Sequence, residues 1–164
     1  MPRTTATHSR VLPIAPDRWP RPATAIALDG LQLAPKPELH VTLVGRALAA
    51  ELHATFGDRA AALIDAARRA QDWRFERTGH CLLLRKAFVE DGRAAVAHSL
   101  VELVELPAMA PFQRALGRRL GRQLPVPPPH VTLYTNGNPK GIGISGPARL
   151  RAFTVRVVMP RELA

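Results

Sequence analysis

The sequence has a single cysteine, Cys81, among 164 residues, which excludes an internal disulfide framework and any zinc cluster built on cysteines. It has no apolar run that approaches the ~20 residues needed to span a bilayer. It also has no charged segment leading into a long apolar one, as a secretory signal would. We therefore expect a cytoplasmic protein that does not bind a membrane.

Acidic residues are missing between Glu105 and Glu162, and this makes the charge of the chain uneven. The whole chain carries a net charge of +10, and residues 106–164 hold nine basic side chains against one acidic side chain. A field of this kind attracts anions, including phosphates and nucleic acid. A basic surface that never meets nucleic acid fits the same charge, so the charge alone leaves both interpretations open.

The order of predicted elements indicates an α+β class with largely antiparallel sheets. Residues 1–22 contain five prolines and no periodicity, which is typical of an extended or flexible N-terminal arm. We expect residues 23–160 to form a single domain. Hydrophobic periodicity and turn residues predict strands at 23–29, 40–44, 73–76, 81–84, 97–106, 130–135 and 151–159 and helices at 48–56, 58–70 and 109–123, with connectors at 31–38 and 136–146. The 97–106 segment also fits a helical period.

Two turn and surface features accompany these elements. The dipeptide Asp91-Gly92 predicts the tip of a hairpin, because both residues tolerate the positive φ that a tight hairpin turn requires. Arg114, Arg118 and Arg122 recur every four residues and so line one face of the third predicted helix. A solvated helix surface explains this row of arginines without any ligand.

One tetrapeptide, His-Val-Thr-Leu, occurs twice, once in each half of the chain. It stands at 40–43 and again at 130–133, each time on a predicted strand. Side chains alternate between the faces of a strand, so histidine and threonine point to one face and valine and leucine to the other. Each copy therefore presents an imidazole beside a hydroxyl on a rigid element. A coincidence of residues that favour strands is the alternative.

If the two strands meet, their side chains suit displacement at a phosphodiester. One histidine takes a proton from the attacking oxygen and the other gives a proton to the departing oxygen. An ordinary histidine pKa near ~6.5 makes both protonation states accessible at neutral pH. The threonine hydroxyls can donate hydrogen bonds to the non-bridging phosphate oxygens, where charge gathers in the transition state.

These two motifs resemble the pair of His-x-Thr/Ser motifs of the two-histidine (2H) phosphoesterases, which include 2′-5′ RNA ligase-like proteins and cyclic phosphodiesterases. The resemblance covers about residues 23–158. It implies a bilobal α+β fold with two antiparallel sheets facing a central cleft and helices outside. It also implies metal-independent opening of 2′,3′-cyclic phosphates, or cleavage or ligation of 2′-5′ linkages, on RNA ends or nucleotide phosphodiesters. It assigns His40 and His130 as the catalytic pair and Thr42 and Thr132 as the phosphate-oxygen donors, and it implies no cofactor.

Three further residues are candidates for binding the substrate. Tyr134 is expected on the face of His130 and Thr132, where its ring could stack on a base. Arg156, on the polar face of the last strand, and Lys140, in the glycine-rich loop, are cations suited to a phosphate. Each also has a purely structural interpretation, as a strand aromatic or a surface cation.

Other site chemistries find less support in the sequence. The loop at 136–146 lacks the Lys-Ser/Thr ending of a P-loop. Glu38 is the one carboxylate near a motif histidine. The two motifs therefore offer few ligands for a metal ion. Cys81, in an apolar strand, is expected to be a buried, inert thiol. Two other functions stay open: an RNA or nucleotide binder without catalysis, and a phosphodiesterase for a small cyclic phosphate that is not RNA.

Overall fold

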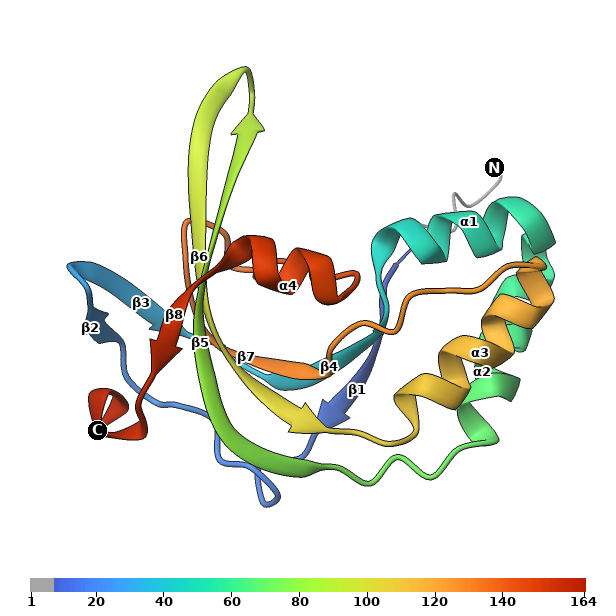
Figure 1. Cartoon of the computed structure of the whole chain (residues 1–164), viewed down its shortest axis with the longest axis horizontal. Coiled ribbons are helices and arrows are strands. Elements are labelled where there is room, and N and C mark those ends of the chain that lie inside the picture. Colours follow the sequence, from blue (N-terminus) through green and yellow to red (C-terminus); the bar gives the residue numbers. More distant parts are fainter. Residues whose placement is uncertain (1–7) are drawn as a thin grey trace.

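The structure is a computed structural model, and it describes residues 8–164. The strands are β1 (Arg10–Ile14), β2 (Ile26–Leu28), β3 (Leu31–Pro35), β4 (Leu39–Val44), β5 (Glu76–Glu90), β6 (Arg93–Glu105), β7 (His130–Asn136) and β8 (Thr154–Val158) (Figure 1). The α-helices are α1 (Arg46–Phe56), α2 (Ala60–Arg69), α3 (Met109–Leu120) and α4 (Pro147–Phe153), and 3₁₀ turns span Gly57–Arg59 and Pro160–Leu163.

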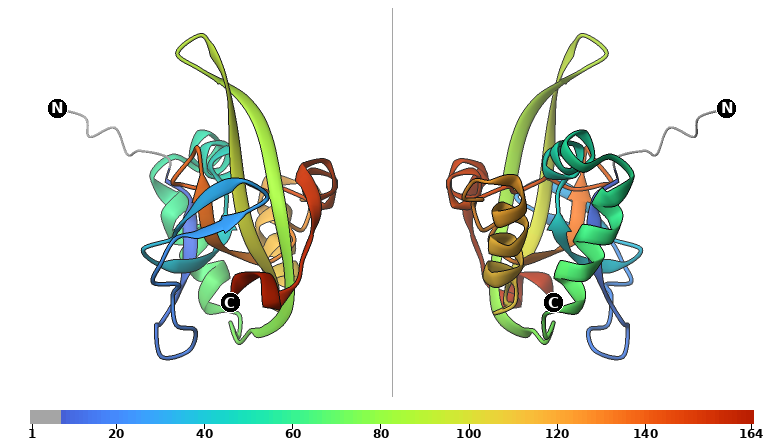
Figure 2. Two further views of the ribbon diagram at one scale, coloured as in Figure 1. Left: turned by 90° about the vertical axis from the view of Figure 1, so that its left-hand side faces the viewer. Right: turned by 90° about the vertical axis from the view of Figure 1, so that its right-hand side faces the viewer.

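The strands form two antiparallel sheets. Six strands pair in the order β2-β3-β7-β6-β5-β8, and this sheet is strongly curled (Figures 1 and 2). The other two, β1 and β4, form a small sheet beside it. Every pairing in both sheets is antiparallel. The expected α+β class with antiparallel sheets is therefore confirmed.

The large sheet is covered on both faces. A main hydrophobic core packs one face against α1, α2 and α3, and its fully buried side chains include Leu52, Ile64, Leu100, Phe112 and Val131. A smaller core on the other face joins β5 and β6 to the segment before α4, through Leu82, Leu84, Val101, Ile142 and Ile144. None of the helices formed by residues 8–164 is long and apolar enough to cross a membrane.

The longest strands, β5 and β6, form a hairpin that projects beyond the rest of the sheet (Figure 1). Asp91 and Gly92 form its tip with φ values of 50° and 75°, the positive values that a two-residue hairpin turn needs. The predicted tip is confirmed, and the 97–106 segment is a strand and not a helix. Trp73 and Phe75, predicted to lie on a strand, precede β5.

Three expectations from the sequence are wrong. The predicted arm over 1–22 extends too far, because β1 pairs with β4 and Trp19 is 3% exposed; residues 1–7 of that arm lie outside the described residues. The predicted connector at 31–38 contains β3, paired with β2 and β7. The predicted strand at 151–159 begins as helix α4 and becomes β8 only at Thr154.

The first two errors have a common cause. The prolines in β1 and β3 led to the prediction that these segments are not strands. In the structure, Pro13 lies on a strand with only one neighbour, and Pro35 is the last residue of its strand. Proline is tolerated at such positions because no ladder hydrogen bond from its nitrogen is required. Pairing with distant strands and the burial of Ile14 and Trp19 then decide the conformation.

Candidate active site

The first His-Val-Thr-Leu motif lies on β4, and the expected alternation is present. Leu39, Val41 and Leu43 are at most 4% exposed and belong to the main core. His40 and Thr42 are half-buried and point to the opposite face. The core therefore holds the strand by its apolar residues and leaves imidazole and hydroxyl together on the other side.

The second motif, on β7, repeats this arrangement. Val131 is fully buried and Leu133 is 6% exposed, both in the main core. His130 and Thr132 are half-buried and lie opposite Leu103 and Val101 of β6. Both of these β6 residues pack with the smaller core. His130 and Thr132 thus lie on the sheet face turned away from the main core.

The structure brings the two motifs together, since β4 and β7 lie side by side (Figure 1). Both strands send their valine and leucine side chains into the same main core, and each His-Thr pair points away from that core. The two histidines are also close enough for their charges to interact, because a charge on His40 lowers the pKa of His130.

Tyr134 does not share this face, which corrects the expectation from the sequence. The pairing of β6 with β7 shifts between Leu100, opposite Tyr134, and Val101, opposite Thr132. One extra residue, Leu133, is therefore accommodated on β7 as a β-bulge, and a bulge breaks the alternation of faces. Tyr134 consequently turns into the main core and is 7% exposed, and burial raises the pKa of its hydroxyl.

His130 is held in one tautomer by the proline-rich segment that leads into β7. Its Nδ1 lies 2.9 Å from the carbonyl oxygen of Pro128. A carbonyl only accepts hydrogen bonds, so Nδ1 carries the hydrogen and Nε2 of the neutral ring is left as a proton acceptor. Burial lowers the pKa of His130 most; the bond to Pro128 opposes this, and the charge of His40 lowers the pKa further.

The ring of His40, unlike that of His130, is not fixed by a hydrogen bond from Nδ1 to any of the described residues. Its Nδ1 is buried and has no hydrogen-bond partner within the described part of the chain. Burial lowers the pKa of His40 most, the charge of Lys36 lowers it further, and Glu38 acts in the opposite direction. At neutral pH both rings therefore favour the uncharged form.

The charge of His40 lowers the pKa of His130 and so opposes protonation of both rings at once. When two neighbouring groups interact, the pair takes up its two protons in separate steps, so that one proton is shared by the pair over an intermediate pH range. In this state one imidazole is an acid and the other is a base. This combination of an acid and a base is what displacement at phosphorus requires.

Lys36 is a basic residue of this site that the sequence analysis missed. It follows β3 directly, and its backbone nitrogen donates a 2.9 Å hydrogen bond to the carbonyl oxygen of Leu133 on β7. Its ammonium group donates a 2.9 Å hydrogen bond to the carbonyl oxygen of Pro139, in the loop after β7. A lysine between two prolines gives no pattern that predicts burial, because the loop that covers it is distant in sequence.

The loop that binds Lys36 also covers the second motif. Gly141 has φ = 88°, and a Cβ on it would lie 3.4 Å from the Thr132 side chain. Next to Thr132 on the same face, the hydroxyl of the fully buried Ser99 accepts a hydrogen bond of 3.2 Å from the backbone of Ile142. The positive φ of Gly141 explains why a residue without a side chain stands there.

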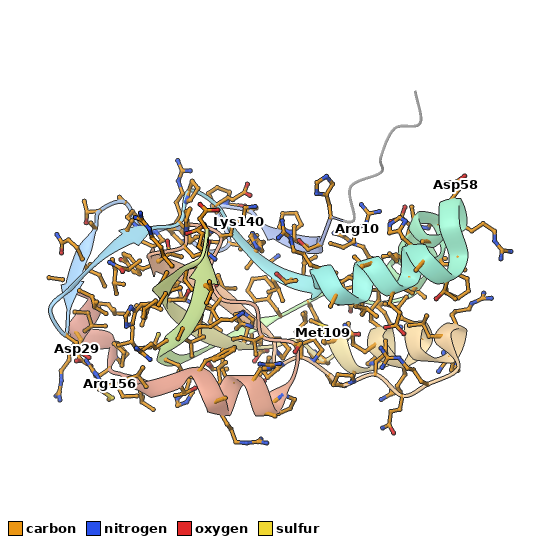
Figure 3. The ribbon with its side chains drawn as sticks, turned by 90° about the horizontal axis from the view of Figure 1, so that it is seen from above. Arg10, Asp29, Asp58, Met109, Lys140 and Arg156 are labelled. Atoms are coloured by element: carbon orange, nitrogen blue, oxygen red, sulfur yellow. The ribbon has the colours of Figure 1, made fainter. Side chains whose placement is uncertain are left out.

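Arg156 is not brought to the motif strands, whereas Lys140 lies in the loop that covers the second motif. Arg156 lies on β8, which β5 and β6 separate from β7, and its guanidinium binds Asp29 and Glu162. Figure 3 shows it beside Asp29 at one end of the molecule, away from Lys140. Lys140 is exposed, in the loop between β7 and α4.

Cys81 is buried at 2% exposure, as expected. Burial, followed by the neighbouring Glu102, raises the pKa of its thiol to about 11. A thiol with such a pKa is a poor nucleophile at neutral pH. Within residues 8–164, no three or more histidine, cysteine, aspartate or glutamate side chains are grouped so as to hold a metal ion.

No protein-family model, curated protein or solved structure matches this chain. The functional assignment therefore depends on the chemistry of the residues described above.

Proposed function

We propose that this protein is a metal-independent phosphoesterase of the two-histidine type that acts on RNA-type phosphodiesters. Its reactions are the opening of 2′,3′-cyclic phosphates and the cleavage or ligation of 2′-5′ linkages. The observation that carries the proposal is that β4 and β7 lie side by side, each with a histidine and a threonine on the face turned away from the main core. The bilobal arrangement of 2H phosphoesterases, with the two motifs facing a cleft, is part of the same proposal.

Opening of a 2′,3′-cyclic phosphate uses the two histidines in opposite protonation states. The neutral imidazole takes a proton from water while the water oxygen forms a bond to phosphorus. The protonated imidazole gives its proton to the departing ribose oxygen while the bond from phosphorus to that oxygen breaks. The products are a phosphomonoester and a free ribose hydroxyl, and the two histidines have exchanged their protonation states.

The threonines act on the charge of the transition state. As the nucleophile adds, negative charge increases on the non-bridging oxygens, and hydroxyl donors positioned for that state lower the barrier. Thr42 and Thr132 stand two residues from His40 and His130 on rigid strands, which suits this role. Ligation runs through the same transition state in reverse, with the two histidine roles exchanged.

The test is hydrolysis of 2′,3′-cyclic AMP and of a 2′-5′-linked dinucleotide by the variants His40→Asn and His130→Asn. Asparagine keeps a donor near the position of Nδ1 and removes the acid–base nitrogen. We expect each variant to lose activity by ~10²-fold or more while its circular dichroism spectrum is unchanged. His80→Asn, at an exposed position on β5, is the matched control. Full activity in either motif variant contradicts the mechanism, and inhibition by EDTA contradicts metal independence.

A second function, RNA binding without catalysis, is favoured by the basic surface of α3. Arg114, Arg118 and Arg119 are exposed there, and none of the ion pairs formed within residues 8–164 includes them. This function predicts binding to single-stranded RNA that weakens steeply with salt and that both histidine variants retain. A third function, hydrolysis of a small cyclic phosphate that is not RNA, is separated by a panel of cyclic nucleotides and ADP-ribose-type cyclic phosphates.

A further inference from the structure

Lys36 is a buried cation whose ammonium group contacts no carboxylate of the described residues, although the more distant charge of Glu38 acts on it and raises its pKa against the larger lowering by burial. Its side chain is 9% exposed, and it takes part in none of the ion pairs within residues 8–164. The only hydrogen bond that its ammonium group makes to these residues is the one to Pro139, whereas an ammonium group has three donors. Since burial of an unpaired charge is costly, the arrangement calls for an additional acceptor.

The position of Lys36 connects the two motifs. Its backbone nitrogen donates a hydrogen bond to the carbonyl oxygen of Leu133 on β7, the residue directly after Thr132. Its side chain ends in the loop whose Gly141 contacts Thr132. Its charge also acts on His40 of β4. The ammonium group is therefore held at the loop that covers Thr132, and its charge acts on His40.

We propose that Lys36 is the anion-binding residue of this site and that its ammonium group binds a non-bridging oxygen of the substrate phosphate. The ligand class is an anionic phosphodiester, together with its phosphomonoester product. This inference rests on the proposed function and adds to it the counter-charge that two hydroxyls do not supply. Attack on a phosphodiester increases the negative charge on the phosphate oxygens, so a fixed cation stabilises the transition state more than the ground state.

Binding of inorganic phosphate tests the proposal without any need for catalysis. Isothermal titration of the full chain compares wild type with Lys36→Met, with Lys140→Met as the rival lysine and the exposed Lys86→Met as the control. We expect Lys36→Met to weaken phosphate binding by about tenfold or more, as the loss of a hydrogen bond to a charged group does, and Lys86→Met to leave it unchanged. The proposal is overturned if wild type binds no phosphate, if Lys36→Met binds as wild type does, or if Lys140→Met alone loses binding.

Melting temperature and the pKa of His40 distinguish an anion-binding Lys36 from a Lys36 that only supports the fold. The anion-binding role makes the following two predictions. Removing an unpaired buried charge should not destabilise the fold, so Lys36→Met should melt no lower than wild type in the absence of phosphate. It should also raise the pKa of His40, measured by NMR, since one cause of its lowering is gone. A lower melting temperature together with an unchanged His40 pKa assigns Lys36 to the scaffold and contradicts the proposal.

Two further measurements keep the outcomes separate. If Lys36→Met does not fold, phosphate is titrated into wild type, and the pKa of His40 should rise as the anion neutralises Lys36; an unchanged pKa overturns the proposal. Loss of phosphate binding in Lys36→Met with no hydrolysis by any form of the protein supports the anion site and contradicts the phosphoesterase. Hydrolysis by wild type together with unchanged phosphate affinity in Lys36→Met supports the phosphoesterase and contradicts the anion site.

Discussion

Arg156 of β8 binds Asp29, in the turn between β2 and β3, through two hydrogen bonds of 2.9 Å. Because β2 and β8 are the two edge strands of the large sheet, this ion pair joins the opposite edges of the curled sheet (Figure 3). The same guanidinium binds Glu162 at 2.9 and 3.2 Å. The hydrogen bonds raise the pKa of Arg156 and lower the pKa values of both carboxyl groups.

Loss of this edge-to-edge contact should destabilise the fold. We expect Arg156→Met to lower the melting temperature and to increase aggregation on heating, since two strand edges lose their connection. Light scattering during a thermal ramp measures both. Arg74→Met is the control, because the Arg74–Asp72 pair is exposed and local in sequence. Equal melting temperatures for the two variants would show that Arg156 does not hold the edges together.

A second ion pair predicts a larger loss of stability. Glu102 is 2% exposed and accepts hydrogen bonds of 3.0 and 2.9 Å from the Arg77 guanidinium. Arg77→Met leaves this carboxylate buried and unpaired, at a cost of about 2 kcal/mol, since the arginine end is half exposed. Urea unfolding measures the change. The double variant Arg77→Met/Glu102→Leu should recover most of the stability, and a double variant as unstable as the single one contradicts this account.

Cys81 should be unreactive in the folded protein. With a pKa of about 11, only about one thiol in a thousand is ionised at pH 8, and the ionised form is the nucleophile. We expect iodoacetamide to label the native protein no faster than the protein unfolds and to label it rapidly in guanidinium chloride. Mass spectrometry follows the reaction. Rapid labelling of native protein contradicts the burial described here.

The motif histidines predict how stability depends on pH. Folding lowers the pKa values of both histidines. At a pH between these lowered values and the ordinary histidine pKa of ~6.5, the unfolded chain therefore binds more protons than the folded protein. Stability is therefore complete above pH ~6.5 and is lost as the pH falls through the folded pKa values. Chemical unfolding between pH 5 and 8 measures this loss. His130→Asn should show a weaker pH dependence than wild type, and an unchanged pH dependence contradicts this assignment.

The same shifts predict the pH dependence of the proposed reaction. The rate constant kcat/KM reports the free enzyme and should be bell-shaped, because one histidine must be protonated and the other neutral. Since both pKa values are lowered, the maximum should lie on the acidic side of ~6.5. Initial rates with 2′,3′-cyclic AMP across pH 4.5–8.5 provide the measurement. A rate that rises steadily up to pH 8.5 contradicts a two-histidine mechanism.

Much of the site could be predicted from local patterns. The faces of His40 and Thr42, and of His130 and Thr132, follow from the two-residue repeat of a strand with core residues between them. Tyr134 could not be predicted in this way, because the bulge at Leu133 arises from the pairing with β6 and not from any residue in the motif. The wrong assignment of β1 has a similar origin, since its partner β4 lies across a proline-rich segment.

The sequence by itself determined which side chains of each strand could act together and where the long hairpin turns, because alternation and turn conformation depend on neighbouring residues. Only the tertiary structure decided that β4 lies beside β7, that Lys36 is covered by a loop 103 residues away, and that Arg156 binds a carboxylate 127 residues away. These relationships depend on how the sheet curls and how its cores pack, and this is settled by the chain as a whole.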